Sequence, residues 1–188
     1  MTISKRLFDI ILSLIIFILI FPFICLLVCL LFLTTPKIIY FSKRIGKNKK
    51  IFLMPKFRTM LEDTPQVATH LLQSPDKYYT KIGFYLRKFS LDEIPQLYSV
   101  IIGDMSLVGP RPALFNQYDL INLRENHGIN NLVPGITGLA QVNGRDNLSI
   151  KEKVYFDHKY KQNLSFYMDF KILFTTFLKV IQKKDIIK

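Results

Sequence analysis

The chain has 188 residues, 49% of them hydrophobic, which suits one domain with a substantial core. Its formal net charge of +12 is unevenly placed, because residues 1–60 hold ten Lys and Arg against one acid, whereas residues 61–188 hold sixteen against thirteen. This placement beside the first hydrophobic run favours anionic lipid over nucleic acid as a partner. Both cysteines lie inside that run and the three histidines lack metal-ligand spacing, which excludes a disulfide framework and argues against a zinc site.

The first predicted element is a long apolar helix. Residues 10–33 carry no formal charge, and as a helix they would extend about 36 Å, more than the bilayer hydrocarbon thickness of about 30 Å. The stretch is too long for a cleaved signal peptide. A single span is one interpretation, but Pro22 divides the stretch into two arms and both flanks are basic. Because basic flanks favour the cytoplasmic side, a re-entrant helix that bends at Pro22 is the other.

A β-hairpin is predicted next, from residues 38–41 and 51–54 joined through residues 46–48. The second strand continues into Lys56 and Arg58, which share one face of an extended segment. These two residues are either charges that keep an edge strand soluble or a basic wall for a phosphate. Residues 62–80 contain two prolines and predict a loop with a short helix, and residues 82–89 predict an amphipathic helix.

Two adjacent carboxylates, Asp92 and Glu93, follow this helix. One interpretation is structural, because Ser90 and Glu93 have the spacing of a capping box and Asp92 would then sit at a positive helix end. Pro95 conflicts with a helix that starts at Ser90, and a start at Asp92 would use that carboxylate as the cap instead. The sequence leaves both starts open.

The other interpretation of this pair is chemical. Arg87 lies upstream of the carboxylates and Arg111 lies downstream, and arginine binds phosphate oxygens two at a time. A helix start also attracts phosphate. A carboxylate held there with a divalent cation could attack a phosphoryl group and form an acyl phosphate.

The rest of the chain predicts turns, a short strand and a C-terminal helix. Pro110 and Pro112 restrict the backbone around Arg111, and Asp104 fits a turn. Residues 134–145 predict a turn, a short strand and a second turn at Asn143–Gly144, directly before Arg145. Residues 164–188 predict a helix with regularly spaced aromatic residues, which either covers the core or lies in the lipid headgroup layer.

Six motifs together resemble a known family: Lys5–Asp9, Lys56–Met60, Ser90–Leu97, Gly103–Pro112, Pro134–Gly138 and Gln141–Arg145. In this order, over about residues 5–175, the chain resembles the bacterial sugar transferases, and more closely the small monotopic phosphoglycosyl transferases in their short, catalytic-core form. The resemblance implies an α+β, mostly helical fold on the cytoplasmic face of the bacterial inner membrane. Residues 1–36 would form a proline-broken re-entrant membrane helix. Residues 37–188 would form a compact catalytic domain with a small β-hairpin and interfacial amphipathic helices.

The resemblance also implies a reaction. Asp92 would attack the sugar-bearing phosphate of a UDP-sugar and release UMP, and undecaprenyl phosphate would then accept the phosphosugar. Mg²⁺, held partly by Asp92, would screen phosphate charge, and Glu93 would serve in acid/base or positioning work. Five basic residues would bind phosphate: Arg87, Arg111 and Arg145, with Lys56 and Arg58 as secondary candidates.

One motif departs from the family, because Phe21–Pro22 stands where a Ser-Pro pair is usual. A serine hydroxyl can bond a carbonyl freed by the proline, so the sharpness of the bend stays open. Residues 62–80 match poorly, which leaves the sugar open. Two other functions compete: a membrane-tethered binding module in which the acids are only caps, and a transferase that moves sugar without phosphate and releases UDP.

Overall fold

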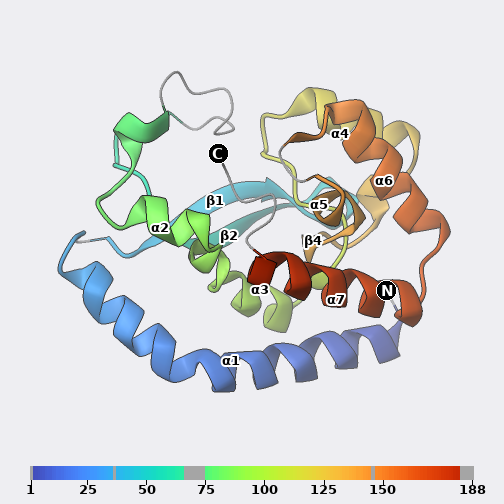
Figure 1. Cartoon of the computed structure of the whole chain (residues 1–188). Helices are drawn as coiled ribbons and strands as arrows, with labels where there is room; N and C mark the ends of the chain where they lie inside the picture. Colours follow the sequence, from blue (N-terminus) through green and yellow to red (C-terminus); the bar gives the residue numbers. More distant parts are fainter. Residues whose placement is uncertain (1, 36, 66–74, 145–146, 183–188) are drawn as a thin grey trace.

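The structure is a computed structural model that describes residues 2–35, 37–65, 75–144 and 147–182 (Figure 1). Its α-helices are α1 (Ile3–Phe32), α2 (Gly83–Lys88), α3 (Gln96–Ile102), α4 (Tyr118–Asn126), α5 (Leu139–Val142), α6 (Ile150–Gln162) and α7 (Phe166–Gln182). Its strands are β1 (Ile39–Ile45), β2 (Ile51–Phe57), β3 (Ser106–Val108) and β4 (Gly135–Thr137). The predicted mostly helical α+β class is therefore confirmed.

Two small strand pairs form the β structure. Strands β1 and β2 pair antiparallel with Tyr40 opposite Lys56, which confirms the predicted hairpin and lengthens both strands. Strands β3 and β4 pair in parallel. The glycines around β4 permit this close packing, because a Cβ on Gly138 would lie 2.1 Å from the carbonyl oxygen of Gly109. The short strand expected in residues 134–145 is present, and helix α5, which was not predicted, follows it.

The main core lies between β2, β3, α3, α6 and α7. Its fully or almost fully buried members include Met54, Val100, Met105, Tyr160 and Ile172. Helix α7 contributes Ile172 to this core and leaves Phe170, Phe174 and Phe177 exposed. Helix α7 therefore has one face against the core and one exposed aromatic face, so the two roles considered for it are compatible.

Helix α1 is one continuous helix of 30 residues that includes Pro22. Figure 1 shows that it runs along the underside of the rest of the chain and changes direction between its two arms. Proline removes a backbone hydrogen bond and is a usual cause of such bends. Both arms contact the domain, since Asp9 and Ser13 are buried in the first arm and Leu27 and Leu31 in the second. Leu27 and Leu31 belong to a cluster with residues of β2 and α2.

The N-terminal basic motif fastens the first arm to the domain. Lys5 Nζ lies 2.6 Å from Asp169 Oδ2 of α7. Arg6 donates hydrogen bonds to the last carbonyls of α3, at 2.7 Å for Ile101. Asp9 is completely buried and accepts a 2.7 Å hydrogen bond from the hydroxyl of Ser106 in β3. The motif therefore has a structural role that the sequence did not indicate.

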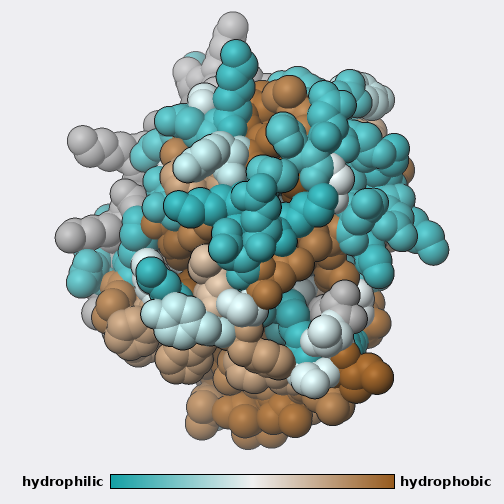
Figure 2. All heavy atoms as spheres, turned by 90° about the vertical axis from the view of Figure 1, so that its right-hand side faces the viewer, coloured by the Kyte–Doolittle hydropathy of each residue, from teal (hydrophilic) through white to brown (hydrophobic). Residues whose placement is uncertain are grey.

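The outer side of α1 is apolar and exposed. By length and composition α1 is the one helix of the described residues that could cross a membrane, and only 11% of its most apolar window is buried. Figure 2 shows the hydrophobic residues gathered along the underside and the hydrophilic residues above them. The exposed side chains of α1 include Ile11, Leu14, Ile18 and Leu19. The protein therefore has a distinct apolar underside.

Candidate functional site

The two carboxylates lie in a short turn between α2 and α3. After α2 ends, Ser90 has a φ of 54°, and residues Leu91–Glu93 form one 3₁₀ turn. The capping box that one interpretation placed at Ser90 is not observed, because the side chain of Ser90 does not cap this turn. Neither expected helix start is observed, since α3 begins at Gln96 with Pro95 before it. Pro95 thus stands where it needs no N–H partner, which explains its tolerance here.

Asp92 lies in a cleft between the hairpin and α2. We call this the basic cleft; its charged lining consists of Lys43, Arg44, Lys56, Arg58, Arg87, Glu62 and Asp92. Asp92 is only 6% exposed. Five cations against two acids favour an anionic ligand, and phosphate in particular, because guanidinium groups bind its oxygens in pairs.

Glu93 is held between two cations. Lys56 Nζ lies 2.9 Å from Glu93 Oε1 and 3.8 Å from Asp92 Oδ2. Arg111 donates to both carboxylate oxygens of Glu93, with its Nη1 at 3.4 Å from Oε2. Lys56 therefore contacts both acids, and Arg111 forms an ion pair with Glu93.

Burial and charge act in opposite directions on these groups. Burial raises the pKa of Asp92. The positive charge of Lys56 acts to lower it, and the negative charge of the neighbouring Glu93 acts to raise it further. Burial also opposes ionisation of Glu93, but Arg111 and Lys56 outweigh it and hold the pKa of Glu93 well below its usual range. Burial lowers the pKa of Lys56, in spite of the two carboxylates. Glu93 is thus a fixed anion, and Asp92 is the acid whose charge is sensitive to what binds nearby.

Two more of the predicted phosphate ligands line the basic cleft. Arg87 lies over the ring of Tyr79 at 5.5 Å from its centroid, with Nη1 3.1 Å from Met60 Sδ. Arg58 donates a 3.0 Å hydrogen bond to the carbonyl of Lys37. Arg145 lies outside the described residues. The structure therefore brings Arg87, Lys56 and Arg58 to one cleft and places Arg111 beside Glu93.

Arg44 also belongs to this cleft, although it was not among the predicted phosphate ligands. Arg44 donates a 3.0 Å hydrogen bond to the hydroxyl of Ser42, and both line the cleft. The signal was available, because alternate residues of a strand share one face and Tyr40, Ser42 and Arg44 follow that alternation. Tyr40 stands opposite Lys56 in the hairpin register, so these three residues of β1 share the face of the sheet that carries Lys56.

A second missed feature lies behind Arg111. Arg124 of α4 is 5% exposed and its Nη2 lies 2.6 Å from Oδ2 of Asp157, which is 1% exposed and belongs to α6. Arg124 Nη1 also donates a 2.8 Å hydrogen bond to the carbonyl of Arg111. This buried pair therefore supports the backbone that carries Arg111.

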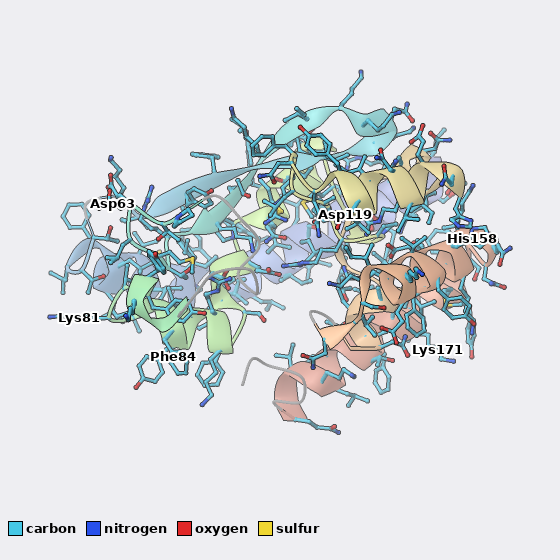
Figure 3. The ribbon with its side chains drawn as sticks, turned by 90° about the horizontal axis from the view of Figure 1, so that it is seen from above. Asp63, Lys81, Phe84, Asp119, His158 and Lys171 are labelled. Carbon is cyan, nitrogen blue, oxygen red and sulfur yellow. The ribbon has the colours of Figure 1, made fainter. Side chains whose placement is uncertain are left out.

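The candidate metal ligand is Asp92. Among the described residues there is no group of three or more His, Cys, Asp and Glu side chains that could hold a metal ion. Mg²⁺ is usually bound by one or two carboxylates together with substrate phosphates and water, so one cleft-lining carboxylate suits it. The ring centroids of His127 and His158 lie 4.8 Å apart, and Figure 3 shows His158 on α6, at the opposite end of the molecule from Lys81 and Phe84. These two histidines therefore lie apart from the site, and His70 lies outside the described residues.

The fold and the site define a class of protein that combines a cleft rich in Lys and Arg with an apolar underside. The sequence profile of the family described as bacterial sugar transferase matches residues 1–183. The chain therefore belongs to the bacterial sugar transferase family.

Individual relatives agree with this family. The chain is 35% identical over 196 residues to the undecaprenyl-phosphate galactose phosphotransferase of Salmonella typhimurium, which covers 96% of this chain and 41% of that protein. It is 39% identical over 184 residues to the UDP-glucose:undecaprenyl-phosphate glucose-1-phosphate transferase of Escherichia coli K12, covering 93% and 39%. It is 36% identical over 190 residues to the exopolysaccharide production protein ExoY of Sinorhizobium fredii, covering 93% and 84%. The chain thus spans about two fifths of the first two relatives and most of the third.

Proposed function

We propose that the protein transfers a sugar phosphate from a UDP-sugar to undecaprenyl phosphate, through a covalent intermediate on Asp92, in the initiating step of glycoconjugate synthesis. The observation that carries the proposal is the position of Asp92, almost fully buried in a cleft rich in Lys and Arg. Cations in such a cleft bind phosphate, and a carboxylate among them is placed to attack phosphorus. The names of the relatives from Salmonella and Escherichia support the two substrate classes.

In the first half-reaction, an oxygen of the Asp92 carboxylate attacks the phosphorus that carries the sugar. A new bond forms between Asp92 Oδ and phosphorus, and the bond from this phosphorus to the bridging oxygen of the diphosphate breaks. UMP leaves with that oxygen as an anion. Arg87 and Arg58 of the basic cleft bind the phosphate oxygens and offset the negative charge that a carboxylate meets on approach.

In the second half-reaction, a phosphate oxygen of undecaprenyl phosphate attacks the same phosphorus. The bond to Asp92 breaks, and the carboxylate returns to its ionised form without a net proton transfer. Glu93 is poorly suited to proton donation, because Arg111 and Lys56 hold its pKa well below the usual range. Its role is to position these two cations against the phosphates.

Asp92 is also the residue that would hold Mg²⁺ together with the substrate phosphates. When bound, the ion supplies electrostatic stabilisation of the phosphate charge and orients the leaving group. Both carboxylate oxygens of Glu93 are bonded to Arg111 or Lys56, which leaves Asp92 as the better ligand.

Helix α1 is proposed to enter and leave the membrane from the cytoplasmic face. Both of its arms pack against the same domain, which a straight span leading away from the domain would not do. Single cysteines at Ser4 and Lys37, in a chain without Cys25 and Cys29, test this topology in intact cells. Neither should react with a membrane-impermeant maleimide until the cells are opened, whereas a crossing helix would expose one of them.

The reaction is tested by incubating the protein with a panel of UDP-sugars, Mg²⁺ and undecaprenyl phosphate and measuring the nucleotide released. We expect UMP; release of UDP would indicate sugar transfer without phosphate, and release of neither would indicate a binding module. Asp92→Asn should abolish UMP release and leave the protein in the membrane fraction. Asp104→Asn is the matched control, because Asp104 is an exposed turn carboxylate. Full activity of Asp92→Asn would dismiss Asp92 as the nucleophile.

A further inference from the structure

A second cavity, lined mainly by apolar side chains, also reaches the carboxylate pair. We call it the apolar groove; its apolar lining includes Ile16 and Ile20 of α1, Leu97 of α3, Ile136 of β4, Val142 of α5 and Val180 of α7. Glu93 lines this groove, whereas Asp92 lines the basic cleft. The two neighbouring acids therefore belong to two different cavities.

The groove contains one polar side chain that the fold leaves without a partner. Gln141 of α5 lines it and is 7% exposed, and neither Nε2 nor Oε1 has a hydrogen-bond partner within the described part of the chain. By contrast, the hydroxyls of Thr137 and Thr176 in the same groove bond to each other at 2.7 Å. Buried amides are nearly always hydrogen-bonded, so an unpartnered one in a cavity marks the place of a polar ligand group.

The shape and chemistry of the groove fit an amphiphile with an anionic head. Two of its lining residues, Ile16 and Ile20, belong to α1, the helix whose outer side forms the apolar underside, so the groove borders the element that would meet lipid. Lys179 adds a positive charge to the lining, and the charge of Glu93 in the same lining is offset by its ion pairs with Lys56 and Arg111, so the groove can accept an anion. The cavity volume of about 230 Å³ is below the range of about 300–1,000 Å³ for pockets that enclose a drug-sized ligand. It therefore suits the head and first units of a long chain.

We infer that the apolar groove is the acceptor site, in which the first isoprene units of the polyprenyl phosphate lie against Ile16, Ile20 and Val180 while the Gln141 amide donates to its phosphate. This inference rests on the proposed function. The acceptor phosphate would reach the turn that carries Asp92 from the lipid side, and the nucleotide would occupy the basic cleft. The lipid would then not have to leave the bilayer or displace the nucleotide to react.

The test separates the two half-reactions in the purified full-length protein. Exchange of labelled UMP into UDP-sugar, without acceptor, reports on the basic cleft and Asp92 alone. The acceptor KM is measured with undecaprenyl phosphate and with geranyl phosphate, a short analogue that shares the head and lacks most of the chain. The variants are Gln141→Leu, which removes the amide, and Val180→Trp, which fills the groove. Phe177→Trp is the matched control, because Phe177 is an exposed residue of the same helix outside the groove lining.

We expect Gln141→Leu to raise the KM for both acceptors about tenfold, as for the loss of one hydrogen bond to a charged group. Val180→Trp should raise the KM for both acceptors, because geranyl phosphate carries the first two isoprene units that the groove would hold. All three variants should keep wild-type exchange, and Phe177→Trp should keep both KM values.

Unchanged acceptor KM values in Gln141→Leu and Val180→Trp, with normal exchange, would overturn the inference and leave the proposed function intact. Loss of exchange in Gln141→Leu would also overturn it, because Gln141 would then serve the donor step. Absence of exchange in the unaltered protein would overturn the proposed function itself, and the inference with it.

Discussion

Removal of Arg124 is predicted to destabilise the protein strongly. Arg124 and Asp157 form a buried ion pair with Nε–Oδ2 and Nη2–Oδ2 distances of 3.0 and 2.6 Å. In Arg124→Leu the Asp157 carboxylate stays buried without its counter-ion, and breaking such a pair costs about 3–5 kcal/mol. For a domain of this size each kcal/mol lowers Tm by about 2–4 °C, so we expect a decrease of about 6–20 °C.

Thermal unfolding of the detergent-solubilised protein, followed by circular dichroism, measures this effect. Glu125→Gln is the matched control, because Glu125 belongs to the same helix and forms an exposed ion pair with Lys49, worth at most about 1 kcal/mol. The double variant Arg124→Leu/Asp157→Leu should recover most of the loss, since no buried charge remains. A decrease in Arg124→Leu no larger than that of Glu125→Gln would refute the reasoning.

The same pair predicts a pH dependence with a definite sign. Burial already raises the pKa of Asp157, and Arg124 opposes that rise. Without Arg124 the pKa of Asp157 rises further, so folding favours the protonated acid. The stability deficit of Arg124→Leu should therefore shrink as the pH is lowered and grow as it is raised. A deficit independent of pH would show that lost packing, not charge, is the cause.

Three further predictions concern single residues. Lys56→Met removes the cation 3.8 Å from Asp92, which should raise the pKa of Asp92 and move the acid side of the pH profile of UMP release to higher pH; an unchanged profile would contradict this. Gly138→Ala places a methyl group 2.1 Å from the Gly109 carbonyl oxygen and should destabilise the protein by about 1–3 kcal/mol. An unaltered Tm in the same unfolding assay would count against the close packing of β3 and β4. Ser149→Ala removes the capping box of α6 and should cost about 1 kcal/mol, whereas Tm equal to that of the wild type would mean the cap is energetically silent.

Local patterns in the sequence predicted the elements that depend on local physics. Alternation and turn residues located the hairpin, and helical spacing of aromatic residues located α7, because each pattern reflects the neighbours that a residue meets within its own element. Neither helix start expected before α3 was observed, because local patterns do not report distant contacts. Ser90 and Glu93 have capping-box spacing, but Glu93 is bonded to Lys56 and Arg111, which are distant in sequence. Contacts outside the helix therefore override the local cap.

The composition of the site could be predicted only in part. The cleft does contain four of the predicted residues: Asp92, Arg87, Lys56 and Arg58. They could be predicted because they stand in or beside motifs that resemble those of a known family. The buried pair behind Arg111 could not be found, since Arg124 and Asp157 belong to α4 and α6 and nothing in the spacing of a helix indicates its partner. The same holds for Lys5 and Asp169, which are 164 residues apart.

The contact of Arg6 with the last carbonyls of α3 sets a fixed spacing within the molecule. Helix α3 is seven residues long, about 10 Å, with helix α1 fastened near its end and the Asp92–Glu93 turn just before its beginning. An insertion of one residue into α3 would rotate its two ends relative to each other by about 100° and could not leave both attachments in place. The length of α3 should therefore tolerate no change. Insertional scanning along the chain would reveal this short segment as the least tolerant outside the cleft itself.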